Sequence, residues 1–221
     1  MMSKMIKKVS QSLGVMSHEI YCLACCLSGL IKVILFFSKD SYNKLEIGAG
    51  ISKKEDMLTV DLDLRSDYPF DLRVGLPFPD ESIDFIYAEH VLEHFQHMDV
   101  KMLLGECKRV MKPGAVLKVS VPDARIYLNA YCNPDGFDHR KFCRFNAGLD
   151  YQLRINYLNY IFYMDGHHHH MFDEESLLYT LESVGFETVR TREFDTALDQ
   201  EARQYESIYA QCIKTDLLII S

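Results

Sequence analysis

The chain has 221 residues, enough for one α/β domain with a sizeable core, alone or with an appendage. Apolar residues make up 48% and charged residues 25%, which is typical of a folded globular domain and excludes a disordered chain. The net charge of −8 argues against binding of nucleic acid, which needs a basic surface. The seven cysteines show no disulfide spacing pattern, which favours reduced thiols in the cytoplasm.

The first forty residues differ in character from the rest of the chain. Lys4, Lys7 and Lys8 precede an apolar run at residues 20–37, whose single charge is Lys32. The run is near the shortest length that spans a membrane. Three interpretations stay open: a helix packed on the domain or on a second copy, an interfacial helix that anchors the protein to a membrane, and a true span. We therefore treat 1–40 as a hydrophobic and basic helical appendage, and we expect peripheral membrane contact or self-association through 1–38.

Beyond residue 41 the pattern alternates between strand and helix. Apolar runs predict strands at 44–47, 57–61, 82–88, 115–121, 186–194 and 207–214. Helical spacing predicts one helix over 99–111, stopped by Lys112-Pro113-Gly114, and a second that starts after the N-cap Asp173 and ends at Gly185. This alternation predicts a doubly wound sheet covered on both faces.

Glycines and a carboxylate stand where the first two predicted strands end. Gly48-Ala49-Gly50 follows the first strand, and Asp61 closes the second. Glycine lets the backbone approach a ligand, and open parallel sheets bind ligands beyond the carboxyl ends of their strands. A carboxylate suits a ribose because its two oxygens match two vicinal hydroxyl donors. These residues predict a nucleotide-type cofactor site at this edge of the sheet.

Five blocks in fixed order resemble class I S-adenosylmethionine-dependent methyltransferases, in particular a small bacterial type-11-like group associated with polysaccharide synthesis. The blocks are LEIGAG at 45–50, VDL at 60–62, GLPFPDESID at 75–84, EHVLEH at 89–94 and ECKRVMKPG at 106–114. Each block alone is weak, and the ordered set, which covers about 44–214, is specific. The resemblance implies a Rossmann-like, seven-stranded, mostly parallel sheet over 41–221, with one antiparallel edge strand supplied by 207–214.

The resemblance also implies S-adenosyl-L-methionine as the cofactor. It would be bound by Glu46, Gly48, Ala49, Gly50, Asp61, Leu62, Asp71, Leu72, Glu89 and His90. Glu46 would order the loop beside the methionine part, Asp61 would accept hydrogen bonds from the ribose hydroxyls, and Asp71 would accept one from the adenine amino group.

Two features depart from the family pattern. Ser52 stands where many members have a third glycine, and only ten residues separate Gly50 from Asp61. Residues 51–56 are too few for the usual crossover helix, so we expect a short loop or a single turn there.

The block at 89–94 carries the most reactive side chains. A hydroxyl acceptor needs a general base, and histidine titrates near neutral pH, so His90, His94 and His170 are the candidate catalytic residues. In the internal run His167–His170 we expect His169 or His170 to reach the site. His90 and His94 lack the glutamate that follows the first histidine of zinc proteases, and Cys22, Cys25 and Cys26 lack a second ligand pair. We predict no metal site.

Residues 123–172 form an insert or lid on the acceptor side. Its tyrosines either pack the lid or offer a flat platform to a sugar, and Arg140, Lys141 and Arg144 either meet a phosphate-bearing acceptor or remain solvated. The expected activity is in-line transfer of a methyl group to a small-molecule or glycan-precursor acceptor. The alternatives are a cofactor-binding or interaction protein that has lost transfer activity, and a nicotinamide-dependent oxidoreductase, which the missing third glycine disfavours.

Overall fold

The computed structural model describes residues 2–50, 53–133 and 135–215, with side-chain environments from residue 14 onward. The strands are β1 Lys44–Ile47, β2 Leu58–Asp61, β3 Tyr68–Pro69, β4 Ile83–Glu89, β5 Met111–Pro122, β6 Glu187–Thr191 and β7 Ser207–Ile213. The α-helices are α1 Met2–Phe36, α2 His97–Val110, α3 Ala124–Cys132, α4 His139–Phe142, α5 Ile155–Tyr163 and α6 Glu174–Ser183.

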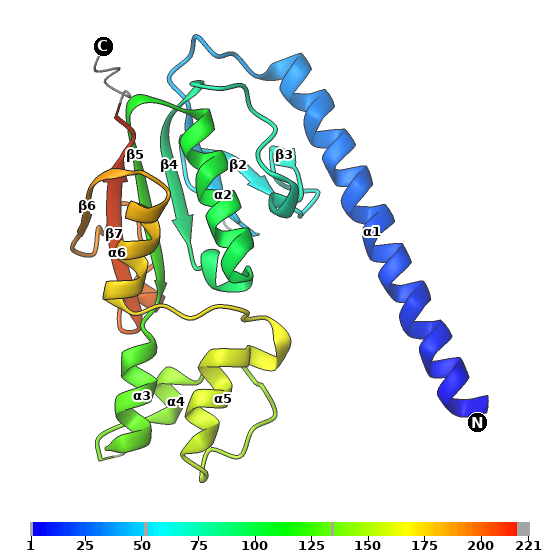
Figure 1. Cartoon of the computed structure of the whole chain (residues 1–221), viewed down its shortest axis with the longest axis vertical. Helices are drawn as coiled ribbons and strands as arrows, with labels where there is room; N and C mark the ends of the chain where they lie inside the picture. The colour runs from blue at the N-terminus through cyan, green and yellow to red at the C-terminus, as the bar shows by residue number, and fades with distance from the viewer. Residues whose placement is uncertain (1, 51–52, 134, 216–221) are drawn as a thin grey trace.

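The strands form one seven-stranded sheet in the order β3-β2-β1-β4-β5-β7-β6 (Figure 1). Strands β1 to β5 are parallel, and the predicted antiparallel strand is confirmed as β7. It is one strand in from the edge where it was predicted, because β6 pairs with its outer side. The chain runs outward from β1 to β3 and then returns to place β4 on the other side of β1. Ligands of open α/β sheets bind at such a switch point, beyond the carboxyl ends of the strands.

The two faces of the sheet differ in polarity. Leu45 pairs with Leu58 on β2 and with Ile86 on β4, and these apolar side chains belong to the main core, over which α2 and α6 lie (Figure 1). One residue along, Glu46 pairs with Thr59 and Tyr87. Because successive strand residues point to opposite faces, the second face is polar.

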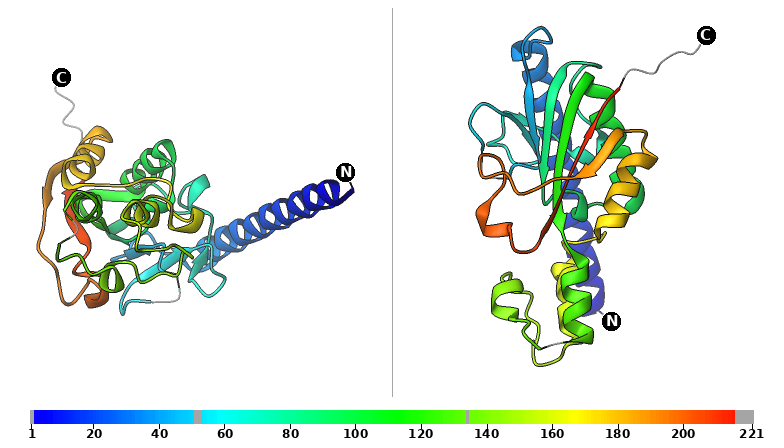
Figure 2. Two further views of the ribbon diagram at one scale, coloured as in Figure 1. Left: turned by 90° about the horizontal axis from the view of Figure 1, so that it is seen from below. Right: turned by 90° about the vertical axis from the view of Figure 1, so that its left-hand side faces the viewer.

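A loop covers this polar face where the doubly wound pattern predicted helices. The connection between β6 and β7 crosses it on the side opposite α6 (Figure 2). Asp195 pairs with Lys118 of β5 at 3.2 Å, and Asp199 accepts a hydrogen bond from the Tyr87 hydroxyl at 2.8 Å. Between β1 and β2, the described residues 48–50 and 53–57 contain no helix, as the short spacing predicted; Ile51 and Ser52 lie outside the described residues.

The predicted helix boundaries need small corrections. Helix α2 begins at His97, two residues earlier than predicted, and ends at Val110 because Met111 already starts β5; Lys112-Pro113-Gly114 therefore lies within the strand. Asp173 caps α6 as predicted. The Ser176 hydroxyl oxygen accepts a hydrogen bond from the Asp173 amide at 3.0 Å, so a serine completes the capping box usually closed by glutamate or glutamine.

Helix α1 lies along the β3 edge of the sheet and extends well beyond it (Figures 1 and 2). Cys22, Cys25 and Val33 are buried, and Val33 belongs to the main core. A Cβ on Gly29 would lie 2.3 Å from the Pro69 carbonyl oxygen, so the helix approaches β3 closely at this glycine. Most of the other apolar side chains of the helix are exposed, among them Ile20, Leu23, Leu27, Leu30, Ile31, Ile34, Leu35 and Phe36. Within the described residues, the segment Gly14–Phe36 is long and apolar enough to cross a membrane, and only 17% of its most apolar window is buried.

A second, smaller core lies beyond the carboxyl end of β5 (Figure 1). It joins α3, α4 and α5, and its buried residues are Tyr127, Ala130, Cys143, Tyr157, Tyr160 and Ile161. The Tyr127 and Tyr160 rings are 5.9 Å apart, so these tyrosines fill the interior of the insert rather than a flat outer platform. The insert is thus a small helical unit placed at the edge of the sheet where ligands bind.

Candidate functional site

The turn after β1 has a backbone conformation that favours glycine. Gly48 and Gly50 have φ of +66° and +56°, a region that side chains other than glycine rarely adopt. A Cβ on Gly48 would also lie 2.5 Å from Cγ2 of Val91. The residues therefore bring the backbone of β1 directly against the segment that follows β4.

Asp61 is fixed by the backbone on both sides. Its Oδ2 accepts a hydrogen bond from the Gly50 amide at 2.9 Å, and its Oδ1 accepts one from the Asp63 amide at 2.9 Å. Each carboxylate oxygen has two lone pairs, so one on each oxygen remains for a ligand. The carboxylate is thus oriented before any ligand arrives.

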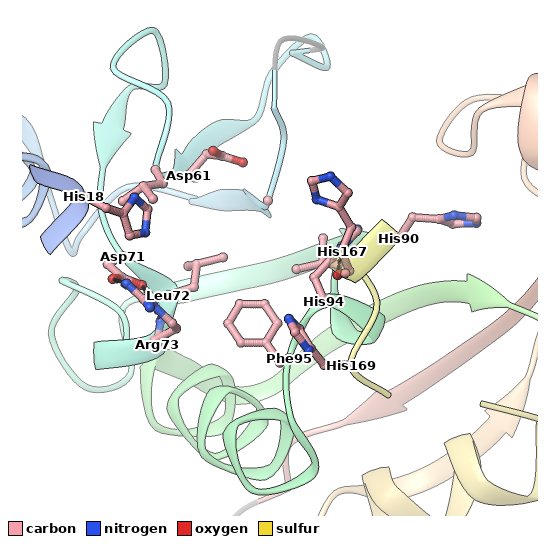
Figure 3. Close-up of a pocket in the computed structure, with 14 residues that line it drawn as sticks. His18, Asp61, Asp71, Leu72, Arg73, His90, His94, Phe95, His167 and His169 are labelled. Atoms are coloured by element: carbon pink, nitrogen blue, oxygen red, sulfur yellow. Dashed lines mark hydrogen bonds and ion pairs between the residues drawn. The ribbon is translucent and has the colours of Figure 1, made fainter. Parts of the chain in front are cut away.

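A cavity of about 590 Å³ opens in front of these residues (Figure 3). It brings together several predicted cofactor residues: Gly48, Asp61, Leu62, Asp71, Leu72 and His90. Glu46, Ala49, Gly50 and Glu89 are not among its lining residues. The sequence pattern missed His18 and Phe95, which also line the cavity.

Helix α1 forms one wall of this cavity. His18 lies on the side of Asp61 and Asp71, opposite His94, His167 and His169 (Figure 3). The Tyr21 hydroxyl donates a hydrogen bond to the Leu62 carbonyl at 3.0 Å, directly after Asp61. The amino-terminal helix is therefore coupled to the cofactor side of the site, which no motif indicated.

Asp71 does not offer a free carboxylate. It caps the short 3-10 helix Leu72–Val74, where it accepts hydrogen bonds from the backbone amide and the guanidinium of Arg73 at about 3.0 Å. Burial raises the pKa of Asp71, but the hydrogen bonds and charge of Arg73 outweigh it, so the pKa lies below its usual value. Any contact with an adenine amino group is therefore made by a carboxylate already paired with a cation.

Glu46 and Glu89 lie on the polar face of the sheet and share one lysine. The Lys54 ammonium is 3.1 Å from Oε1 of Glu46 and 3.3 Å from Oε2 of Glu89, and 4.7 Å from the centre of the Tyr87 ring. Burial raises the pKa of Glu46, and the Lys54 ammonium offsets part of that rise. Lys54 belongs to the loop between β1 and β2, so Glu46 ties that loop to the sheet.

His90 has a defined tautomer. Its Nε2 is 2.7 Å from the Ser207 hydroxyl, which donates its own proton to the Arg203 carbonyl at 2.8 Å. Nε2 of His90 must therefore carry the proton and Nδ1 the lone pair. Burial keeps the pKa of His90 well below its usual value, so the ring is neutral at neutral pH.

The next turn, the 3-10 helix Leu92–His94, brings Glu93 and His94 together with His168. One ligand-type atom from each of the three side chains lies within 4.8 Å of the other two. Glu93 is fully buried, and burial raises its pKa to about 8. Neither of its carboxylate oxygens has a hydrogen-bond partner among the described residues.

The histidine run is held against this turn by the backbone. The His169 amide donates to the Glu93 carbonyl at 2.8 Å, and His94 donates from Nδ1 to the His167 carbonyl at 2.8 Å. His168 is the buried member, at 5% exposure. His170 lines neither cavity and instead packs on Phe172, with ring centres 4.6 Å apart. The expectation that His169 or His170 alone would reach the site is therefore corrected: His168 reaches the Glu93 cluster, and His167 and His169 line the first cavity.

A second cavity of about 430 Å³ lies between this turn and the helical insert. It shares His90, His94 and His167 with the first cavity. Its other walls include Arg144 and Arg203, and among the described residues neither of these arginines forms an ion pair. Two adjoining cavities thus meet at the histidines that follow β4.

Comparison with known proteins gives a family-model match over residues 31–191, described as a methyltransferase domain. A protein of Mycolicibacterium smegmatis named as a probable S-adenosylmethionine-dependent methyltransferase is 40% identical over 65 residues, which are 27% of this chain. The matched region spans about a quarter (24%) of that relative's length.

Solved methyltransferase structures resemble this chain. Phosphoethanolamine N-methyltransferase 2 of Haemonchus contortus, in complex with S-adenosyl-L-methionine, gives a TM-score of 0.50 at 13% identity, over 85% of this chain and 52% of that one. A SAM-dependent methyltransferase of Thermotoga maritima gives 0.48 at 20% identity, over 91% and 96% of the two chains.

Proposed function

The chain belongs to the methyltransferase domain family, and we propose that it transfers a methyl group from S-adenosyl-L-methionine to a small-molecule or glycan-precursor acceptor. The observation that carries this proposal is the shared cavity of Gly48 and Asp61, with the Gly50 amide bound to Asp61 at 2.9 Å. A glycine turn and an oriented carboxylate at adjacent strand ends suit an adenosyl group, with the ribose hydroxyls on Asp61.

The acceptor occupies the second cavity. The shared histidines mark the junction, so a methyl group presented from the first cavity meets an acceptor held in the second. Arg144 and Arg203 line this cavity together with Glu93 and Glu206, and neither arginine forms an ion pair among the described residues, so both can bind an acceptor that carries phosphate or carboxylate. Glycan precursors with a phosphate group belong to this class.

Methyl transfer requires alignment more than covalent chemistry. The methyl carbon of the sulfonium is already electrophilic, and holding the acceptor in line with the carbon–sulfur bond supplies roughly 7–11 kcal/mol. A hydroxyl acceptor must also lose a proton. His90 is the candidate base because its ring lines both cavities; His94 shares that junction.

The outward face of α1 binds a membrane surface. Its apolar side chains from Ile20 to Phe36 are exposed, and the sequence places Lys4, Lys7 and Lys8 at the amino-terminal end, where they would meet anionic lipid headgroups. The body of the protein is acidic overall, so this basic end is the part that electrostatics would draw to such a surface. Binding there would hold the enzyme near membrane-bound acceptors.

Two measurements test the activity. Calorimetry should detect S-adenosylhomocysteine binding and no NAD binding; the reverse result would assign the protein to nicotinamide chemistry. Transfer of labelled methyl from S-adenosylmethionine to a metabolite and glycan extract should then yield a labelled product. Cofactor binding without any labelled product would favour the alternative, a binding protein without transfer activity.

A further inference from the structure

We propose that Glu93, His94 and His168 form a binding site for a divalent cation of the zinc type, at the junction of the two cavities. Two imidazoles and one carboxylate are the protein ligands of several zinc enzymes, which leave a fourth position open to water or substrate. The three side chains come from two segments, the turn after β4 and the histidine run, which are joined by the hydrogen bond from the His169 amide to the Glu93 carbonyl.

The spacing of the ligand atoms is close to that of a metal site. Nε2 of His94 is 3.9 Å from Oε1 of Glu93, and all three ligand atoms lie within 4.8 Å of one another. Ligands about 2.1 Å from a tetrahedral zinc ion are roughly 3.4 Å apart. Small rotations of the side chains would bring the atoms to that spacing.

The histidines are oriented by backbone carbonyls, as metal-binding histidines are. His94 is hydrogen-bonded from Nδ1 to the His167 carbonyl at 2.8 Å, and His168 from Nδ1 to the Ile161 carbonyl at 2.7 Å. Each carbonyl can only accept, so each Nδ1 carries the proton and each Nε2 is left with its lone pair. Both rings are thus locked in the tautomer that binds a metal through Nε2.

Glu93 supplies the strongest argument for a cation. Its side chain is 1% exposed, and its two oxygens have no hydrogen-bond partner among the described residues. A buried polar group without partners is costly, and such groups in native structures pair or coordinate metals. The imidazoles that face Glu93 have neutral lone pairs, which do not stabilise a carboxylate; a cation between them would satisfy all three groups.

The site has access to ligands. The His94 side chain is 44% exposed and lines both cavities, whereas Glu93 and His168 line only the second. A cation held here would have its open position toward the second cavity, where it could bind an oxygen of the acceptor. This role rests on the proposed function, since it places an oxygen-bearing acceptor beside the methyl donor.

The test uses the full-length protein without an affinity tag, dialysed against a chelator. Calorimetric titration with ZnCl₂ should show one site, and CoCl₂ should give the visible absorption bands of four-coordinate Co²⁺. Glu93→Gln and His168→Gln should each weaken Zn²⁺ binding by roughly tenfold or more. His169→Gln is the matched control from the same run. It should leave Zn²⁺ affinity within about twofold, because His169 is exposed and lies outside the cluster.

The controls distinguish Zn²⁺ binding at this site from Zn²⁺ binding by the four consecutive histidines alone. If His169→Gln weakens binding as much as His168→Gln while Glu93→Gln has no effect, the run alone binds the metal and the proposal is wrong. Far-ultraviolet circular dichroism and the thermal unfolding temperature of each variant verify folding. Cofactor binding without Zn²⁺ binding would overturn this proposal only, whereas Zn²⁺ binding without cofactor binding would overturn the proposed function.

Discussion

The backbone amide of Gly50 donates a hydrogen bond to Oδ2 of Asp61 across 2.9 Å, which joins the turn after β1 to the end of β2. The bond orients the carboxylate toward the cavity that Gly48 and Asp61 both line. The two strand ends thereby act as one surface, and substitutions at either should affect the same ligand.

Replacing Asp61 with alanine should weaken S-adenosylhomocysteine binding by about 1–3 kcal/mol, because the ribose hydroxyls lose a charged acceptor. Calorimetric titration of the purified variant with S-adenosylhomocysteine measures this loss of binding free energy. Asp63→Ala is the matched control, since its side chain pairs with Arg65 and its backbone amide, which holds Asp61, is kept. Equal affinities for wild type and Asp61→Ala would remove Asp61 from the cofactor site.

Lys54→Met should destabilise the fold by about 3 kcal/mol, because it leaves Glu46 and Glu89 buried without their shared cation. Lys53→Met is the neighbouring control. Lys53 pairs with Asp67 at the surface, and 55% of its side chain is exposed. The Lys53→Met substitution should therefore lower the free energy of unfolding by at most about 1 kcal/mol. Urea unfolding of both variants measures the difference, and equal losses would contradict a special role for Lys54.

Asp199→Asn should destabilise the protein by about 3–5 kcal/mol at neutral pH, because the buried Arg192 guanidinium, 2.6 Å from Asp199, loses its counter-charge. Burial raises the pKa of Asp199, but its bonds to Arg192 outweigh this and hold the pKa below its usual value.

A lowered pKa in the folded state fixes the pH dependence of this effect. The stabilisation by ionised Asp199 is present above its unfolded pKa of about 3.9 and is lost as pH falls through the lower folded pKa. The gap in unfolding free energy between wild type and Asp199→Asn should therefore be constant from pH 7 to pH 5 and narrow only in stronger acid. Denaturant unfolding at several pH values measures it, and a gap that widens in acid would contradict the assignment.

Replacing Leu27, Ile31 and Ile34 together with glutamine should reduce flotation with anionic liposomes by roughly tenfold or more, because these exposed side chains form the outer face of α1. A matched triple variant at other exposed apolar sites, Met98, Leu153 and Tyr179, should float like wild type. If the α1 variant floats unchanged but loses a dimer seen by light scattering, the face binds a second copy instead of lipid.

Much of the fold could be predicted because its signals are local. The apolar runs at 44–47 and 82–88 locate β1 and β4 within a residue or two, and Asp173 marks the start of α6. Strand β3 escaped prediction because Tyr68–Pro69 is too short to show any periodicity. The polarity of the second sheet face was not predicted, because the loops that cover this face show no apolar pattern in the sequence.

The sequence predicted those residues of the candidate site that lie at the carboxyl ends of parallel strands. Gly48 follows β1 and Asp61 is the last residue of β2, and parallel strands end at one edge, so their positions in the sequence predict that they lie together. Lys54, by contrast, lies in an irregular loop, and its two carboxylate partners are 8 and 35 residues away. No sequence pattern links such residues.

The sequence by itself determined the sheet, the family resemblance and the glycine–carboxylate pair, because strand periodicity and parallel geometry place those residues without knowledge of other contacts. Only the tertiary structure decided which histidine of the run turns inward. The four residues are chemically identical, and left-handed backbone at Met164 and Asp165, with φ of +39° and +55°, sets the direction of the chain before them. The buried position of His168 and the cavity wall formed by α1 arise from long-range packing, which a local pattern does not record.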